Sequence, residues 1–286
     1  MSGSREEQRS WHRRFPVRTV APAGRQAREC SAPGGGAPSV IEFRSVSKRY
    51  EGGELGLLRA TFTVFRGEFV FLVGATGSGK STVMRLLIKE IEPSRGTIRV
   101  AGHDLATISS KHVESYRRNI GVVFQDFKLL PGLTVSENVA YALEVTGGSR
   151  TEIRATVLEL LRLTGLATKL HNFPDELSGG EQQRASIVRA FVNHPPLLLA
   201  DEPTGNLDRA TSIDIMRLLY RINRTGTTVL VATHDQAMVD KMRRRVLELS
   251  HGRLVRDEAA GLYTRDESTR EFARRLRAPS TRPPGI

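Results

Sequence analysis

The sequence predicts an α/β fold with a mainly parallel central sheet. Between residues 40 and 255, short apolar runs typical of buried strands alternate with stretches of helical periodicity. This alternation indicates βαβ units, in which a helix connects each strand to a parallel neighbour. A Gly-rich loop follows one of the strands and an acidic pair follows another. Both patterns fit loops at the carboxyl edge of such a sheet.

The expected elements follow in chain order. Strands are expected at residues 40–43, 61–65, 69–73, 97–100, 120–124, 197–200, 227–232 and 245–249. Helices are expected at residues 81–91, 180–193 and 209–223, and mostly helical structure over 135–170. Because the long helical stretch interrupts the alternation, we expect a helical subdomain over about 126–180, inserted in the sheet core.

The two ends of the chain differ in composition from the domain expected over 40–255. Residues 1–39 are rich in Arg, Pro, Gly and Ser. We expect a disordered basic tail there, or a segment upstream of the native start. Residues 256–286 are expected to form a charged tail with a short Arg-rich helix over 266–277. The net charge of +12 fits an anionic partner such as nucleic acid, a nucleotide or a membrane surface, although ordinary solvation explains it as well.

Cysteine content and hydropathy exclude several classes of protein. The chain has one cysteine, Cys30, so it has no intrachain disulfide framework and no Cys-based metal site. No apolar run approaches the roughly 18 residues that a membrane span needs. The first 30 residues lack the apolar region of a secretory signal. If the protein works at a membrane, we expect another subunit to supply the span.

Residues 74–81 fit the phosphate-binding pattern G-x-x-x-x-G-K-[ST], between a predicted strand and a predicted helix. Glycines let the main chain wrap close to phosphates, and the helix presents its positive N-terminal end. We expect Lys80 to reach the β- and γ-phosphates and the Ser81 hydroxyl to bind Mg²⁺. The expected nucleotide-binding residues are Gly74, Ala75, Thr76, Gly77, Ser78, Gly79, Lys80, Ser81 and Thr82. An ordinary Gly-rich turn is the alternative.

Four apolar residues at 197–200 lead directly into Asp201 and Glu202. A buried strand delivers such a pair to its carboxyl edge, beside the phosphate loop. There we expect Asp201 to hold Mg²⁺ through water and Glu202 to polarise the attacking water. Acidic pairs after strands are common, so this pattern alone does not establish the function.

Residues 177–184 read Leu-Ser-Gly-Gly-Glu-Gln-Gln-Arg. The serine followed three residues later by glutamate predicts a capped helix start, and a Ser-Gly-Gly turn opening a helix also forms an anion site. The segment resembles the signature motif of ABC ATPases. That resemblance covers roughly residues 40–255. It implies that Ser178, Gly179 and Gly180 contact the γ-phosphate of a nucleotide held by a second copy.

The resemblance assigns roles to four further residues. Gln125, after the strand at 120–124, matches the glutamine that senses Mg²⁺ and links to the helical subdomain. His234 matches the histidine that contacts the γ-phosphate, and Asp208 the aspartate that crosses the dimer interface. Tyr50 matches the aromatic residue that stacks on adenine, although a tyrosine ending a strand often serves only for packing.

The family resemblance also implies a fold and a mechanism. The fold is a P-loop NTPase core with an antiparallel β subdomain and the inserted helical subdomain. Two chains pair head to tail and enclose two ATP molecules with Mg²⁺, whose ligands are Ser81, Gln125 and Asp201. Lys80, Glu202 and His234 are the implied catalytic residues, and their presence implies a competent ATPase.

The segment after Gln125 is more specific than the nucleotide motifs. Residues 124–131 read Phe-Gln-Asp-Phe-Lys-Leu-Leu-Pro, and residues 133–147 end in Ala-Leu-Glu-Val-Thr-Gly. This segment resembles the cell-division ATPases of the FtsE family. The resemblance implies an integral membrane partner of FtsX type that docks around 126–140, further division-site proteins as partners, and a place on the cytoplasmic face of the cell membrane at the division site. The complex would control peptidoglycan hydrolases. Packing in the helical subdomain is the alternative explanation for Phe127, Leu129 and Leu130.

Two other functions remain open. Related ATPases of lipoprotein-extraction and macrolide-efflux systems share the Leu-Leu-Pro and Glu-Asn-Val segments, although they usually lack the aspartate at the position of Asp126. ABC proteins that act on DNA or ribosomes usually carry two nucleotide domains or a long coiled-coil insertion. Neither feature is visible in the sequence, so no nucleic acid partner is expected.

Overall fold

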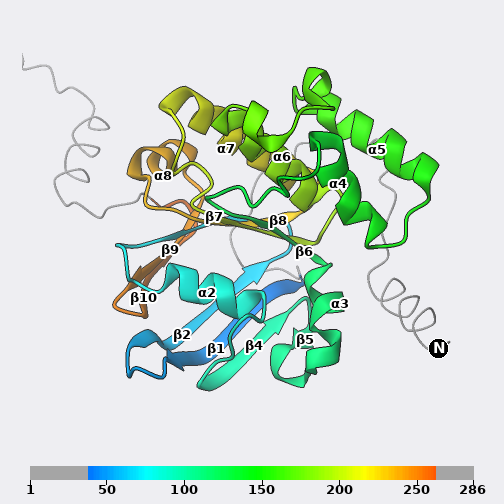
Figure 1. The fold of residues 1–286 in the computed structure, drawn as a ribbon. Coiled ribbons are helices and arrows are strands. Elements are labelled where there is room, and N and C mark those ends of the chain that lie inside the picture. The colour runs from blue at the N-terminus through cyan, green and yellow to red at the C-terminus, as the bar shows by residue number, and fades with distance from the viewer. Residues whose placement is uncertain (1–37, 262–286) are drawn as a thin grey trace, which may run out of the picture. The chain divides into compact units, whose positions relative to one another are not determined.

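A computed structural model describes residues 38–261 (Figure 1). Most of the tail expected to be disordered over 1–39, and the expected Arg-rich helix over 266–277, lie outside the described residues, but Ser39 already belongs to the first strand. The strands are β1 (Ser39–Arg49), β2 (Leu55–Phe65), β3 (Phe69–Val73), β4 (Arg95–Val100), β5 (His103–Asp104), β6 (Ile120–Val123), β7 (Leu197–Asp201), β8 (Thr228–Ala232), β9 (Arg245–Ser250) and β10 (Arg253–Glu258). The α-helices are α2 (Lys80–Leu87), α3 (Val113–Arg117), α4 (Val135–Glu144), α5 (Arg150–Leu163), α6 (Gly179–Phe191), α7 (Arg209–Arg224) and α8 (Gln236–Met242).

The strands form two sheets, and the prediction of a mainly parallel central sheet is confirmed. The larger sheet has six strands in the order β10-β9-β3-β8-β7-β6. Neighbours from β9 to β6 are parallel, and only β10 is antiparallel to its neighbour. The smaller sheet is antiparallel, in the order β2-β1-β4-β5.

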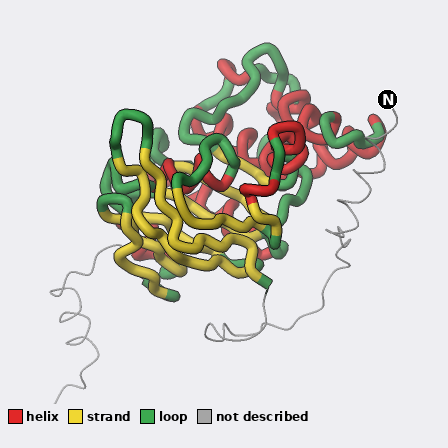
Figure 2. Tube along the Cα trace, turned by 90° about the horizontal axis from the view of Figure 1, so that it is seen from below, coloured by secondary structure: helices red, strands yellow, loops and turns green. Residues whose placement is uncertain are grey.

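Helix α2 lies between the two sheets, and α6, α7 and α8 cover the opposite face of the larger sheet (Figure 1). In Figure 2 the strands gather on one side and most of the helices on the other. Strands β3 and β8 are buried along their whole length because both faces are covered. This explains why they appear in the sequence as continuous apolar runs.

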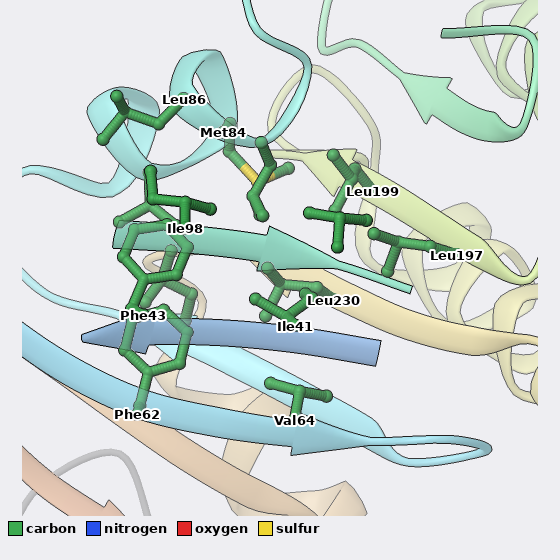
Figure 3. Close-up of a cluster of buried hydrophobic side chains, with 14 of the residues drawn as sticks. Ile41, Phe43, Phe62, Val64, Met84, Leu86, Ile98, Leu197, Leu199 and Leu230 are labelled. Atoms are coloured by element: carbon green, nitrogen blue, oxygen red, sulfur yellow. The ribbon is translucent and has the colours of Figure 1, made fainter. Parts of the chain in front are cut away.

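The layer between the sheets is one apolar cluster (Figure 3). Phe43 and Phe62 of the smaller sheet stack with ring centroids 4.5 Å apart, and Leu86 of α2 and Leu199 of β7 belong to the same cluster. A second cluster joins the other face of the larger sheet to α6 and α7, with Phe71 fully buried in it. Burial on both faces fixes the sheet edge that carries the functional loops.

The helical insertion contains two helices, α4 and α5, separated by a loop that includes Gly147 and Gly148. Capping boxes at Thr134 and Ser149 start the two helices. Their apolar faces pack with α6 in a third cluster that includes Val139. The expected helical subdomain is therefore present, and the prediction of mostly helical structure over 135–170 is confirmed.

The expected boundary near residue 255 needs correction, because β10 continues to Glu258. Arg256, expected in the charged tail, is 6% exposed and its Nε donates to Glu248 Oε2 at 2.7 Å. An edge strand needs few apolar residues, so its charged sequence gave no strand signal. Two short helices, α3 and α8, were also not predicted. Within residues 38–261 no helix is both long and apolar enough to cross a membrane.

Candidate functional site

The functional loops converge at the carboxyl edge of the larger sheet. Leu72 of β3 lies opposite Ala232 of β8, and Ala232 lies opposite Asp201 of β7. The loops that follow these strands therefore begin side by side, as expected for parallel strands. The structure in this way brings together the residues predicted at 74–82, at 201–202 and at 234.

The phosphate loop, defined here as residues 74–81, is packed against main-chain atoms. Gly79 has φ +110°, and a Cβ placed there would lie 2.5 Å from the carbonyl oxygen of Gly56. Gly74 has φ +146°, and its Cβ would lie 2.3 Å from the carbonyl oxygen of Leu249. Only glycine tolerates both the dihedral angle and the close approach. Ala75, at the outer turn of the loop, is exposed.

Lys80 lies inside the phosphate loop. Its side-chain amine donates to the carbonyl oxygens of Gly74 at 2.7 Å and Ala75 at 3.2 Å, and the residue is 8% exposed. The buried hydroxyl of Ser78 has no hydrogen-bond partner among the described residues. Ser81 is exposed at the start of α2. A buried ammonium and a free buried hydroxyl in one loop fit the binding of an anion.

Tyr50 lies beside the first turn of α2. Its hydroxyl is 3.1 Å from Thr82 Oγ1, and its ring edge is 2.8 Å from the position that a Cβ of Gly56 would take. The side chain of Lys48 lies 5.5 Å from the ring centroid. The predicted aromatic residue is therefore adjacent to the phosphate loop, and stacking on a base stays a prediction.

Glu202 and His234 are in direct contact. Nδ1 of His234 is 2.9 Å from Glu202 Oε1, and the His234 main-chain N–H donates to Oε2 at 3.3 Å. Glu202 has φ +46°, an uncommon conformation for a non-glycine residue. Its main-chain N–H donates to the carbonyl oxygen of Ala232 at 2.9 Å, which holds that conformation. The Glu202 side chain is 15% exposed and that of His234 is 67% exposed.

Burial raises the pKa of Asp201, and repulsion from Glu202 raises it further, while Lys80 acts in the opposite direction. A buried carboxylate beside a second carboxylate is a favourable position for a cation. Residues 38–261 contain no cluster of three or more acidic, histidine or cysteine side chains with metal-site geometry. Mg²⁺ is usually held by one or two carboxylates, water and substrate phosphates. The predicted donors Ser81, Asp201 and Gln125 fit that kind of site.

Gln125 contacts the loop that follows Glu202. Its Nε2 donates to Asn206 Oδ1 at 3.3 Å, and Asn206 Nδ2 donates to the Gln125 carbonyl oxygen at 3.4 Å. Asp208, two residues further on, caps α7 and accepts from the main-chain N–H groups of Ala210 and Thr211. The Thr211 hydroxyl is the main cause that lowers the pKa of Asp208. The carboxylate of Asp208 is thus satisfied by its own helix.

The signature turn, defined here as Ser178, Gly179 and Gly180, opens α6 with the predicted capping box. Glu181 Oε2 accepts from the Ser178 N–H at 2.8 Å and from its hydroxyl at 2.9 Å. The main-chain bond is the largest cause that lowers the pKa of Glu181. Ser178 is exposed. Within residues 38–261 no hydrogen bond or ion pair joins the signature turn to the phosphate loop.

Two residues of α6 that sequence reasoning missed contact the functional loops. Gln183 is fully buried and its Nε2 donates to the carbonyl oxygen of Pro203, next to Glu202, at 2.8 Å. Arg189 donates to the carbonyl oxygens of Phe127 and Lys128. A polar residue on the buried face of a helix is the sequence signal for Gln183. The partners of Arg189 lie about 60 residues away in the chain, so the sequence gives no signal for them.

Comparison with known proteins identifies the family. The family model described as ABC transporter matches residues 57–205, just over half of the chain. The cell division ATP-binding protein FtsE of Mycobacterium tuberculosis is 54% identical over 228 residues, which cover 79% of this chain and 99% of that protein. FtsE of Streptococcus pneumoniae serotype 2 is 51% identical over 229 residues, which cover 80% of this chain and 100% of that protein.

Solved structures agree with this result. The dimeric post-hydrolysis state of the ATP-binding cassette MJ0796, bound to ADP and Pi, is similar with a TM-score of 0.71 and 35% identity, over 77% of this chain and 99% of that chain. CbiO1 of Clostridium perfringens gives a TM-score of 0.74 at 27% identity, over 83% and 94% of the two chains. The chain therefore belongs to the ATP-hydrolysing subunits of the ABC transporter family and, within it, to the FtsE group of cell division ATP-binding proteins.

Proposed function

We propose that this chain drives a cell-division complex at the membrane, in which an integral membrane protein of FtsX type is its partner and peptidoglycan hydrolysis is the controlled process. The observation that carries the proposal is the identity of about one half to FtsE proteins over nearly their whole length. The aligned regions of 228 and 229 residues are long enough to include the segment after Gln125, whose sequence resembles that of FtsE proteins.

ATP binding follows from the phosphate loop. The loop wraps its main chain around the phosphates, with α2 directing its N-terminal end at them. Lys80 exchanges its two carbonyl partners for β- and γ-phosphate oxygens when the nucleotide enters. Tyr50 stacks on the adenine, because it lies beside the start of α2.

Hydrolysis is assigned to the contact between Glu202 and His234. Glu202 orients and polarises the attacking water, and His234 holds the carboxylate and reaches the γ-phosphate. Ser81, Asp201 and Gln125 hold Mg²⁺, which when bound neutralises charge on the β- and γ-phosphates. The two contacts of the Glu202 carboxylate with His234 keep its orientation fixed.

The second half of each nucleotide site comes from a second copy. The signature turn presents the N-terminal end of α6, and its serine hydroxyl is exposed. In a head-to-tail homodimer this turn contacts the γ-phosphate held by the partner's phosphate loop. The solved relative MJ0796 is described as dimeric with ADP and Pi bound, which supports this arrangement. Loss of the γ-phosphate contacts after hydrolysis then releases the dimer.

The membrane partner is the protein on which ATP hydrolysis acts. We propose that it docks around residues 126–140, next to Gln125, and that the ATPase transmits a conformational change to it. The test is purification of the tagged full-length chain from detergent-solubilised membranes of its own organism, followed by identification of bound membrane proteins.

An FtsX-type protein in stoichiometric amount is the expected result. A permease of lipoprotein-extraction or macrolide-efflux type in its place would overturn the assignment to cell division. Recovery of the ATPase without any membrane protein, while the detergent extract contains the FtsX-type protein, would also overturn it.

A further inference from the structure

The segment of residues 126–130 contains a strained turn. Phe127 and Lys128 are consecutive and both lie in the left-handed region, with φ of 60° and 49°. Non-glycine residues adopt this conformation only where surrounding contacts enforce it. The ion pair of Lys128 with Asp126, at 2.7 Å, joins two exposed side chains and contributes little. The main-chain bonds of the Phe127 N–H to Phe124 and of the Lys128 N–H to Asp126 are local to the turn. A contact from outside the segment is needed to hold the turn in place.

Arg189 of α6 supplies this contact. Its Nη1 donates to the Lys128 carbonyl oxygen at 2.7 Å and its Nη2 to the Phe127 carbonyl oxygen at 3.3 Å. Burial lowers the pKa of Arg189, and within residues 38–261 it forms no ion pair. A partly buried guanidinium directed at two main-chain oxygens forms charge-assisted bonds that fix the turn.

The turn directs Phe127 toward the signature turn. The Phe127 Cζ atom is 3.8 Å from the position that a Cβ of Gly179 would occupy, and Leu207 Cδ2 is 3.3 Å from it. Leu207 comes from the loop after Glu202, and Phe127 from the segment after Gln125. One side chain from each of these two loops therefore lies beside Gly179.

The other end of the segment is fixed to α4. Asn138 is fully buried, its Oδ1 accepts from the Leu130 N–H at 2.8 Å, and its Nδ2 donates to the carbonyl oxygens of Leu130 and Leu133 at 3.1 and 2.9 Å. Arg189 and Asn138 thus fasten residues 126–130 at both ends. A segment held in this way moves as a unit.

We propose that Phe127 is a positioning residue that couples residues 126–130 to the signature turn, with Arg189 holding it in the coupling geometry. A displacement of the segment by a docked partner shifts the Phe127 ring and with it the amide groups at Gly179 and Gly180. The inference rests on the proposed function, in which this turn completes the nucleotide site of the second copy.

The test is hydrogen exchange on the full-length chain without nucleotide, read in the peptide that covers residues 177–183. Phe127→Ala removes the ring that lies beside Gly179. We expect local opening of the signature turn to become more frequent, so that exchange in this peptide rises about tenfold. Leu130→Ala is the matched control, because Leu130 is a partly exposed apolar residue of the same segment and its contacts with Asn138 are made by its main chain. It should leave this peptide unchanged.

Arg189→Ala should give the same acceleration as Phe127→Ala, and Arg189→Lys should restore part of the protection. Phe127→Leu provides a milder variant if Phe127→Ala does not fold. Unchanged exchange at 177–183 in the Phe127 variants, or equal acceleration in Leu130→Ala, would overturn the coupling. The readout needs neither ATP nor a partner, so it decides the coupling separately from the proposed two-copy nucleotide site. That site fails its own test if Glu202→Gln does not dimerise with ATP.

Discussion

The phosphate loop and the signature turn are both Gly-containing anion sites at helix N-termini, but they are supported differently. Gly74 and Gly79 approach main-chain oxygens of neighbouring strands, and the Gly252 N–H donates to the Ser78 carbonyl oxygen at 3.0 Å. The nearest neighbours of the signature turn are side chains instead: a Cβ at Gly179 would meet Leu207 and Phe127, and a Cβ at Gly180 would meet Thr211. Main-chain contacts move only with the sheets, whereas side chains have alternative rotamers. The loop proposed to hold ATP is therefore fixed, and the turn proposed to complete the site of the second copy is adjustable.

The two regions also differ in electrostatics. The pKa of Asp201 is raised by burial and by Glu202, so its ionised form is less favourable than in water and gains from a nearby cation. The pKa values of Glu181 and Asp208 are lowered by hydrogen bonds within their own capping motifs. Asp201, beside the phosphate loop, thus gains from a bound cation. Glu181 and Asp208 already have hydrogen-bond donors for their carboxylates without a ligand.

The largest expected effect comes from Glu202→Gln in the fixed region. We expect the ATP turnover rate to fall by about 100-fold or more, the usual contribution of a positioned general base, while ATP binding persists because the phosphate loop is unchanged. Steady-state phosphate release and equilibrium ATP binding measure the two quantities. Glu144→Gln, at an exposed position at the end of α4, is the control and should keep normal turnover. A near-normal rate in Glu202→Gln would refute its role.

The next effect tests whether the phosphate loop is rigid. Gly79→Ala combines φ +110° with a Cβ 2.5 Å from a carbonyl oxygen, so we expect it to cost about 2 kcal/mol or more of unfolding free energy and to abolish ATP binding. Gly102→Ala has a similar φ of +83° but no atom within 4 Å, and should cost about 1 kcal/mol with normal ATP binding. Chemical denaturation and nucleotide titration distinguish them. Equal effects of the two variants would show that the close approach is unimportant.

Gly179→Ala tests whether the signature turn is adjustable. The new Cβ would meet Leu207 Cδ2 at 3.3 Å, the end of a flexible side chain, and the φ of Gly179 is not positive. We expect a change in unfolding free energy within about 0.5 kcal/mol, unchanged ATP binding by the monomer, and slower turnover. Loss of ATP binding in this variant would contradict the division of labour between the two regions.

The smallest expected effects are changes of stability with pH, which have opposite signs for Asp201 and Glu181. The pKa of Asp201 is higher in the folded state than in the unfolded state, so the folded state binds this proton more tightly. The free energy of unfolding therefore falls as the pH rises from the ordinary aspartate pKa through the raised one. Asp201→Asn should therefore raise the melting temperature at neutral pH without nucleotide, and the gain should vanish in acid below the ordinary aspartate pKa. Glu181, with a lowered pKa, contributes stability above the ordinary glutamate pKa and loses it as pH falls.

Glu181→Gln should therefore lower the melting temperature at neutral pH and have no effect in acid. Thermal melts of both variants and the wild type between neutral and acidic pH check the pair. The same sign of change in both variants at neutral pH would contradict the electrostatic contrast.

The predictable parts of the molecule are those in which sequence neighbours determine the structure. The apolar run of β3, the phosphate loop and the Ser178–Glu181 capping box are local, and the structure agrees with the prediction at each. Strand β10 was missed because its pairing with β9, and the ion pair of Arg256 with Glu248, compensate for a charged sequence. Long-range pairings of this kind leave no periodic signal in the strand itself.

The candidate site shows the same division. Residue types and order predicted Lys80, Glu202 and His234, but the contact between the last two depends on the register of β7 and β8. The left-handed turn at Phe127 was not predictable, because the residue that holds it, Arg189, is far away in the chain. The supporting contacts of the signature turn are therefore the part that needed the structure.

The most direct test of the two-copy nucleotide site is the molar mass of Glu202→Gln in solution, by light scattering after size exclusion with Mg²⁺ and ATP. We predict a dimer with ATP and a monomer with ADP, and a monomer under both conditions when Ser178→Arg is added, since a bulky cation blocks the signature turn. A monomer of Glu202→Gln in ATP, or a dimer that persists in the Ser178→Arg double variant, would contradict the proposal that each site is completed by the signature turn of the second copy.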